Sequence, residues 1–290
     1  MRIAITGASG FLGRVIVPAL RARGHEVVAL ERDAIGDLAA VADWPTLLGG
    51  SEAVVHLAAL AHARGVDDAR LHAVNVAASA AIGKAAAATG ARLLFMSSAK
   101  VLGEETTDKP FDDRSPVSPQ DAYARAKAGA EAQLRAISGL RLTVLRPPLV
   151  YGPGVRANFL ALLRAVARGW PLPLAAIDNR RSLVGASNLA DAVARCLETT
   201  KAEGRTYCVT DGEAVSTPAL CRAIAAALGR NARLFALPTV LLEIAPAARK
   251  LTRSLVLDDG AIRRELGWAP PRAFDEELRI TAEWFLARGS

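Results

Sequence analysis

The chain has 290 residues, of which 51% are hydrophobic, and a formal net charge of +7. This length allows one or two domains with a full hydrophobic core. No apolar run approaches the roughly 18 residues of a membrane span, and the first expected strand starts at residue 2, so we predict neither a span nor a signal peptide. The three cysteines, an odd number without a Cys-x-x-Cys pair, favour reduced thiols in a cytoplasmic protein.

The basic charge is spread along the sequence. The 36 Lys and Arg residues are not clustered or interleaved with aromatic residues, as a nucleic-acid partner would require. A polyanionic small substrate, such as a nucleotide diphosphate, also suits a basic protein. We therefore expect a small-molecule substrate, with no nucleic-acid partner and no metal site.

A glycine-rich turn follows the first expected strand, Arg2–Thr6. Gly7-Ala-Ser-Gly10-Phe-Leu-Gly13 then opens a helix with one apolar face. Such a turn lets backbone N–H groups approach a pyrophosphate at the helix N-terminus, where the helix dipole also favours anions. The pattern predicts a dinucleotide site, although an ordinary strand-to-helix turn would have the same local sequence.

Apolar runs alternate with helical patterns through the first half of the chain. This alternation predicts an α/β fold, a Rossmann-type doubly wound parallel sheet over residues 1–150. From about Tyr151, Gly and Pro interrupt the pattern, which predicts that 151–290 form mainly a smaller substrate-binding lobe that does not fold alone, with isolated strands near Leu183 and Tyr207. The other expected strands are Glu26–Leu30, Ala53–Leu57, Arg92–Ser97 and Arg141–Arg146, and the long helices are Ala69–Thr89 and Pro119–Ser138.

Four polar residues are candidates for chemistry. Tyr123 and Lys127 lie four residues apart on an expected helix, so both share one face. A positive neighbour lowers the pKa of a phenol, which would make Tyr123 a workable acid or base. Ser98 follows an expected strand, and Asn75 lies inside an expected helix, where Asn is unfavourable. Each has an ordinary alternative. Tyr123 and Lys127 could lie on a solvated helix face, Ser98 could serve only the turn, and Asn75 could be an exposed helix residue.

The ordered set of motifs resembles the extended short-chain dehydrogenase/reductase family, in its nucleotide-sugar epimerase/dehydratase group. The resemblance covers essentially the whole chain. It rests on the Gly7–Gly13 turn, His56-Leu-Ala-Ala59, Asn75, Phe95-Met-Ser-Ser-Ala-Lys-Val-Leu-Gly103, Tyr123 with Lys127, Leu145-Arg-Pro-Pro-Leu-Val-Tyr-Gly152, Asn179-Arg-Arg-Ser-Leu-Val184 and Leu266-Gly-Trp-Ala-Pro270.

The resemblance implies a role for each matching position. Ser98 would hydrogen-bond the substrate oxygen, Tyr123 would move its proton, and Lys127 would hold the nicotinamide ribose and lower the pKa of Tyr123. Asn158 and Arg181 would hold the nucleotide diphosphate, for which the planar guanidinium is suited. The residues implied to bind the cofactor are Gly7, Gly10, Phe11, Leu12, Gly13, Leu57, Ala58, Ala59, Asn75, Lys127 and Pro147.

At two places the sequence departs from the family pattern, and these departures narrow the choice of reaction. Family dehydratases carry Asp-Glu directly after the catalytic hydroxyl, where this chain has Ala99-Lys100, so dehydration is not expected. Epimerases commonly have Tyr before the glycine of this segment, where the chain has Leu102. The surrounding pattern is similar to bacterial surface-polysaccharide enzymes that act at C4 of UDP-N-acetylated hexoses.

The residues after the second expected strand are the ones expected to contact the adenosine part of the cofactor. A carboxylate at Glu31 would accept both ribose hydroxyls of NAD and repel a 2′-phosphate, whereas Arg32 could accept the phosphate of NADP. We favour NAD and keep NADP open. Asp37 resembles the family's residue at the adenine edge.

We therefore predict a cytoplasmic NAD(P)-dependent enzyme that transfers hydride at C4 of a UDP-sugar, as an epimerase of a UDP-hexose or UDP-N-acetylhexosamine. A 4-reductase of a UDP-4-keto-6-deoxy-hexosamine is the main alternative. A reductase of a non-sugar carbonyl compound and a non-catalytic NAD(P)-binding sensor are the others. The Ala-rich helices Ala69–Thr89 and Ala122–Ala136 could also pair two copies into a homodimer.

Overall fold

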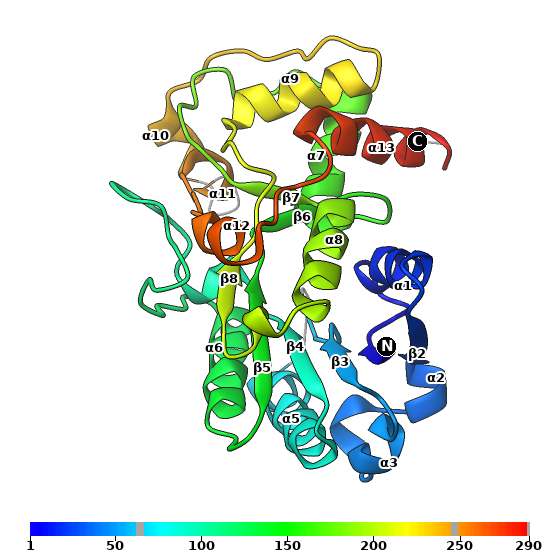
Figure 1. The fold of residues 1–290 in the computed structure, drawn as a ribbon. Helices are drawn as coiled ribbons and strands as arrows, with labels where there is room; N and C mark the ends of the chain where they lie inside the picture. The colour runs from blue at the N-terminus through cyan, green and yellow to red at the C-terminus, as the bar shows by residue number, and fades with distance from the viewer. Residues whose placement is uncertain (62–66, 245–248, 289–290) are drawn as a thin grey trace.

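A computed structural model describes residues 1–61, 67–244 and 249–288 (Figure 1). Its main sheet has six parallel strands in the order β2-β1-β3-β4-β5-β8, which confirms the predicted fold class. The predicted strands form with ends within one residue of expectation. Their bounds are β1 Arg2–Thr6, β2 Glu26–Leu30, β3 Ala53–His56, β4 Arg92–Met96, β5 Arg141–Arg146 and β8 Thr206–Cys208.

The strand order places a topological switch point between β1 and β3. The chain passes from β1 to β2 on one side, then crosses back to β3 on the other. Loops after the two central strands therefore diverge, which opens a crevice at the carboxyl edge of the sheet, where ligands of such folds bind.

Helices cover both faces of this sheet (Figure 1). On one face, α1 (Gly13–Ala22) and α8 (Ala186–Leu197) share a buried apolar core with Ile3 and Ile5 of β1. On the other face, α3 (Trp44–Leu48), α5 (Ala78–Thr89) and α6 (Ala122–Arg135) pack against the alternate strand residues, such as Ala4 and Val54. Strand side chains point alternately to the two faces, so each strand is apolar throughout.

The two long predicted helices differ in detail from expectation. The predicted helix Ala69–Thr89 is built from α4 (Asp68–His72), a π-helical segment (Ala73–Ala77) and α5. The predicted helix Pro119–Ser138 is the shorter α6, because the Asp121 carboxylate caps it by accepting the Ala124 N–H at 2.7 Å. The remaining short elements are α2 (Arg32–Ile35) and three 3₁₀ turns, Leu38–Ala40, Ala99–Val101 and Thr200–Ala202.

A smaller lobe surrounds a second parallel pair, β6 (Leu149–Tyr151) and β7 (Leu183–Gly185), which confirms the strand predicted near Leu183. A separate apolar core joins this pair to three helices. These are α7 (Ala157–Ala167), α9 (Thr217–Ala227) and α13 (Phe274–Leu286), and the short helices α10 (Thr239–Leu242), α11 (Arg249–Thr252) and α12 (Gly260–Leu266) complete the chain.

The strand near Tyr207 does not belong to the smaller lobe, contrary to prediction. It is β8, which pairs with β5 in the main sheet through Leu145 opposite Tyr207. Pairing satisfies the exposed edge of β5 and buries Tyr207 and Cys208. The chain after residue 150 thus contributes to both parts of the molecule.

Candidate active site

The glycine turn folds as tightly as its sequence suggests. Gly7 has φ +75°, and a Cβ there would lie 2.8 Å from the Ala58 nitrogen. A Cβ on Gly13 would lie 2.3 Å from the Ala8 carbonyl oxygen. No side chain caps the N-terminus of α1. These features fit the pyrophosphate of a dinucleotide.

Strand register brings other predicted cofactor residues to this turn. Thr6 pairs with Leu30 on one side and His56 on the other, so Glu31 and Leu57 each lie beside Gly7. Glu31 and Arg32 are both exposed. Their roles in choosing between NAD and NADP remain predictions.

Other predicted cofactor residues also have structural partners. Asp37 caps the 3₁₀ turn after α2 and pairs with Arg70 at 2.6 Å, and its pKa is lowered by the Ala39 N–H first and by Arg70 second. Phe11 packs against the core of the smaller lobe, and Leu12 packs against the core of the main sheet. Contact of these three residues with a cofactor stays a prediction.

A buried chain of hydrogen bonds runs under the crevice. Ser79 Oγ donates to the Asn75 carbonyl at 2.8 Å, so it accepts from His56 Nε2 at 2.8 Å. His56 Nδ1 then accepts from Thr6 Oγ1 at 2.6 Å, and Thr6 Oγ1 accepts the Ala58 N–H at 3.4 Å. Burial, with the Lys127 charge, lowers the pKa of His56 to about 3, so its ring is neutral with hydrogen on Nε2.

Asn75 continues this chain into the loop after β3. It is buried within the π-helical segment, not exposed as one interpretation of the sequence allowed. Its Oδ1 accepts the Leu60 N–H at 2.8 Å and its Nδ2 donates to the Leu60 carbonyl at 3.1 Å. Asn75 therefore positions the predicted cofactor loop Leu57–Ala59 through the residue that follows it.

The two serines after β4 have different surroundings. Ser97 is buried, and its hydroxyl is hydrogen-bonded to Glu131. Ser98 is half-buried and accepts the Lys100 N–H at 3.3 Å. The neighbouring Ala99 N–H donates to the Pro147 carbonyl at 2.9 Å, so Ser98 and Pro147 lie together at the carboxyl edge. Ser98 is thus the serine free to meet a substrate.

Tyr123 and Lys127 lie in the first two turns of α6, one turn apart. Lys127 is fully buried, and its Nζ donates to the Met96 carbonyl at 2.7 Å and lies 4.5 Å from the centre of the Phe95 ring. This places Lys127 at the end of β4, next to the Ser97-Ser98 segment. Burial lowers the pKa of Lys127 to about 7, against the opposing charge of Glu131.

The pKa of Tyr123 differs from the sequence-based expectation. Burial first, and then the Asp121 carboxylate, raise it to about 12, whereas we predicted that Lys127 would lower it. The reason is that the same burial that brings the pair together disfavours the phenolate and also disfavours the charged form of Lys127. In this structure Tyr123 is a neutral phenol at pH 7.

Lys100 ties the Ser98 loop to the start of α6. Its Nζ pairs with the Asp121 carboxylate, and with Glu104 at 3.2 Å. The loop that follows β4 is thereby held against the N-terminus of the helix that carries Tyr123. The two positions after Ser98 are thus a buried Ala99 and a paired Lys100, in place of the Asp-Glu pair expected of a dehydratase.

A buried ion pair anchors the next turn of α6. Glu131 accepts hydrogen bonds from Arg146 at 3.0 and 2.7 Å, in a bidentate pair between α6 and β5. Arg135 adds a contact at 2.8 Å. Breaking such a pair leaves a buried charge, so it fixes how α6 lies on the sheet.

The predicted diphosphate residues lie in the smaller lobe. Arg181 is largely buried just before β7, where its Nη1 donates to the Arg253 carbonyl at 2.9 Å. Asn158 is exposed in the first turn of α7, after Ala157, whose φ of 52° is left-handed. Such strain in a non-glycine residue concentrates near functional sites. Binding of a diphosphate by this pair stays a prediction.

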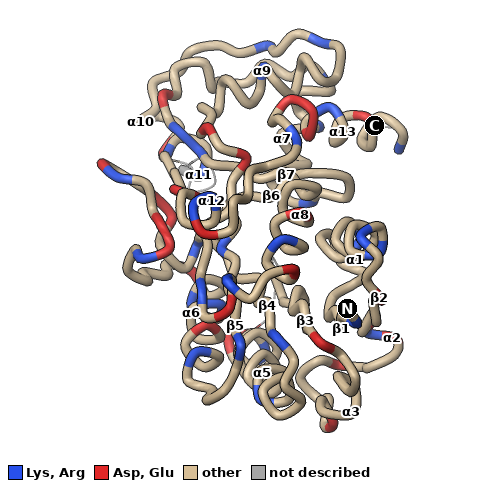
Figure 2. The backbone as a smooth tube through the Cα atoms, viewed as in Figure 1, with Lys and Arg blue, Asp and Glu red and all other residues tan. Residues whose placement is uncertain are grey.

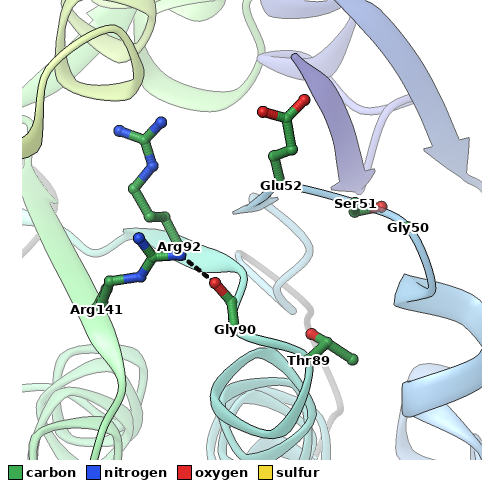
Figure 3. A pocket seen from close by; sticks show the side chains of 7 residues that line it. All are labelled: Gly50, Ser51, Glu52, Thr89, Gly90, Arg92 and Arg141. Carbon is green, nitrogen blue, oxygen red and sulfur yellow. Dashed lines mark hydrogen bonds between the residues drawn. The ribbon is translucent and has the colours of Figure 1, made fainter.

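A separate polar pocket of about 380 Å³ lies at the amino ends of β3, β4 and β5 (Figure 3). Its two arginines, Arg92 and Arg141, both approach Glu203, at 3.8 and 3.7 Å. The pocket is at the opposite edge of the sheet from the predicted site residues, and its cations are already paired. We assign it no function.

Comparison with known proteins decides the family. The family model described as "NAD dependent epimerase/dehydratase family" matches residues 3–210. The chain belongs to this family. The predictions of the fold, of an extended short-chain dehydrogenase/reductase and of an enzyme are thereby confirmed.

Relatives within the epimerase/dehydratase family span different reactions. UDP-glucose 4-epimerase of Vibrio cholerae is 34% identical over 98% of this chain and 95% of its own. A dTDP-4-dehydrorhamnose reductase of Mycolicibacterium smegmatis is 34% identical over 58% of this chain and 51% of its own. The Bordetella bronchiseptica enzyme WbmG, solved with NAD and UDP, has a TM-score of 0.83 at 23% identity, covering 100% of this chain and 96% of its own.

Sequence reasoning missed the groups that support this site. Thr6, His56 and Ser79 were not among the predicted residues, and neither was Glu131. Thr6 and His56 are each a polar residue at the end of an apolar run. Because a buried polar group needs a hydrogen-bond partner, they could have been recognised as members of a buried network. Their partners are 23 and 50 residues away, which no local pattern shows.

The neutral His56 ring predicts a loss of stability in acid. Its pKa is about 3 in the folded chain and near 6.5 unfolded, so below pH 6.5 the unfolded chain binds more protons and is favoured. We expect this group alone to cost about 3 kcal/mol between pH 7 and pH 4. Urea unfolding across this range should show a steeper loss in the wild type than in His56→Asn. His72→Asn, on the surface of α4, is the control, and equal slopes in wild type and His56→Asn would refute the assignment.

Proposed function

We propose that this enzyme transfers hydride at C4 of a UDP-sugar and acts as a 4-epimerase of a UDP-hexose or UDP-N-acetylhexosamine. The observation that supports the proposal is the Lys127 hydrogen bond to the Met96 carbonyl at the end of β4, two residues before Ser98, with Tyr123 one turn earlier on the same helix. The near-full-length similarity to a UDP-glucose 4-epimerase supports this choice of substrate class. Surface-polysaccharide precursors are the proposed products.

NAD is the proposed cofactor, and when bound it would accept the C4 hydride and return it. The Gly7–Gly13 turn and the start of α1 would hold its pyrophosphate, since only glycine fits where Cβ atoms would meet backbone. Lys127 would hold the ribose next to the nicotinamide. Glu31, beside Gly7 by register, would accept the adenosine ribose hydroxyls.

Tyr123 moves the proton at the sugar oxygen. As a neutral phenol it is ready to donate to a C4 keto oxygen, which Ser98 orients. Taking a proton from a C4 hydroxyl needs the phenolate, and a charged Lys127 one turn away would favour that form. Arg181 and Asn158 would hold the diphosphate, so that the keto-sugar can rotate while the nucleotide stays in place.

A 4-keto-reductase is the second candidate. Two observations favour it: Tyr123 rests in the proton-donating form, and Leu102, where family epimerases commonly have Tyr, is buried against Val101 and Leu257. In this reaction Tyr123 and Ser98 keep their roles, and hydride moves only once. The same residues therefore serve both candidates.

We also propose a cytoplasmic homodimer. The three cysteines are buried free thiols, in keeping with a reducing compartment. In the ranges described, none of the helices combines the length and apolar composition needed to cross a bilayer. The proposed paired surface is the groove between α4, the π-helical segment and α6, which Leu71, Val76 and Gly129 help to line.

Removing one hydroxyl tests the proposed chemistry. Tyr123→Phe should lower kcat for UDP-glucose and UDP-galactose interconversion by about 10² to 10⁴, because proton transfer is lost. NAD affinity should stay within about threefold. The matched control is Tyr207→Phe, whose hydroxyl bonds Glu265 on the far edge of the sheet. Unchanged turnover in Tyr123→Phe would exclude Tyr123 from the mechanism.

The fate of the cofactor separates the two candidate reactions. An epimerase should retain NAD through purification and interconvert C4 epimers without added cofactor, because hydride returns to the same sugar. Protein that is isolated empty and oxidises NADH or NADPH with a UDP-4-keto-sugar would be a reductase. Reversed-phase analysis of released nucleotides and the two activity assays give the answer.

Cofactor choice is tested at the end of β2. We expect NADH to bind more tightly than NADPH, and Glu31→Gln to weaken NADH binding about tenfold, because a hydrogen bond to a charged group is lost. Arg32→Gln should leave NADH binding nearly unchanged. Fluorescence titrations measure both, and tighter binding of NADPH by the wild type would assign the role to Arg32 instead.

A further inference from the structure

The short helix α10 presents its apolar side chains to solvent. Val240 and Ile244 are each 76% exposed and Leu241 is 53% exposed. Its inward residue Leu242 packs against the core of the smaller lobe. Large aliphatic side chains gathered in this way mark an interaction surface.

Two aromatic residues extend this surface along the outer end of the smaller lobe. Trp170 is 53% exposed and Phe235 is 47% exposed. They are close together because the segments that carry them pair: Leu172 N–H donates to the Arg233 carbonyl at 2.8 Å, and Phe235 N–H donates to the Leu172 carbonyl at 3.0 Å. The chain between α9 and α10 crosses this end of the molecule (Figure 1). We call Trp170, Phe235, Val240, Leu241 and Ile244 the outer apolar patch.

The segments around the outer apolar patch carry an excess of positive charge, with one carboxylate, Glu243, between Leu241 and Ile244. Residues 152–177 and 214–242 contain no Asp or Glu. They contain six arginines, several of which are exposed beside the patch (Figure 2). The Arg168 guanidinium lies 5.4 Å from the centre of the Trp170 ring. The six are Arg156, Arg164, Arg168, Arg222, Arg230 and Arg233.

The patch is connected to the proposed site by hydrogen bonds. Next to it, Glu243 accepts from Thr252 Oγ1 of α11 at 3.0 Å. The following residue, Arg253, gives its carbonyl to Arg181 Nη1 at 2.9 Å. Arg181 is the residue proposed to hold the diphosphate, so these contacts join the segment beside the patch to the proposed site.

From this geometry we propose that the outer apolar patch docks the enzyme on an anionic lipid bilayer. Aliphatic and aromatic side chains would enter the acyl boundary, and the arginines would meet the lipid phosphates. Docking in this orientation brings the segment that is joined to the proposed site near the lipid surface. The proposal concerns binding and does not depend on which sugar the enzyme converts.

A second copy of the chain is the less suitable occupant. A symmetric pair brings the same patch of each protomer together. The six arginines of one copy would then face those of the other, and each patch offers a single carboxylate, Glu243, which already lies 3.9 Å from Arg253 of its own chain. Like charges at a close interface are unfavourable, whereas an anionic bilayer neutralises both sides of the patch.

Vesicle sedimentation of the full-length protein tests the proposal. We expect the protein to bind vesicles of phosphatidylcholine that contain about one third phosphatidylglycerol, and we expect salt to weaken this binding. It should bind little to vesicles of phosphatidylcholine alone. The double variant Val240→Ser/Ile244→Ser should bind at least about tenfold more weakly. Arg168→Gln/Arg233→Gln should lose about fivefold for each charge removed.

Matched variants elsewhere provide the controls. Val117→Ser/Leu286→Ser removes side chains that are 48% and 47% exposed outside the patch, and Lys84→Gln/Lys201→Gln removes two exposed charges. Both should bind vesicles like the wild type, and circular dichroism checks folding of every variant. Equal binding to neutral and anionic vesicles, or patch variants that bind like the controls, would overturn the proposal. Sedimentation velocity showing that the patch variants dissociate a dimer would also overturn it.

Discussion

The hydrogen-bond chain centred on His56 is the interaction on which the crevice depends. It joins the ends of β1 and β3 to the helical run that follows, through Thr6 and Ser79. Each hydroxyl both donates and accepts, so the chain works only with a neutral ring. Its last member, Asn75, fixes the loop that faces Gly7. The buried hydrogen bonds beneath the crevice therefore determine the shape of the proposed cofactor site.

A second constraint sets α6 on the sheet. Glu131 and Arg146 form a buried bidentate pair, and Lys127 one turn earlier reaches the Met96 carbonyl. Burying Lys127 is unfavourable for its charge, which its lowered pKa reflects. The buried amine is therefore held at a cost in stability, which is common at functional sites and is consistent with the proposed role of Lys127.

The family pattern predicted much of this site because each motif has a local cause. Gly7 and Gly13 are required by backbone contacts within one turn or one neighbouring loop, and Tyr123 with Lys127 needs only helical spacing. The pKa of Tyr123 was not predictable in the same way. It depends on burial and on Asp121, and burial acts on both members of the pair at once. The strand at Tyr207 was likewise placed in the wrong lobe, because pairing with β5 spans more than 60 positions of sequence.

The sequence by itself determined the parallel α/β sheet and the glycine turn, because periodicity and short-range sterics encode them, and its ordered motifs indicated the family and, through it, the residues proposed for hydride chemistry. Only the tertiary structure decided which serine is free, since Glu131 binds Ser97 and leaves Ser98. It also decided that His56 is neutral and that five apolar side chains remain exposed on an arginine-rich end. Burial and hydrogen-bond partners far along the chain govern these properties, and a local sequence pattern shows neither the burial nor the partners.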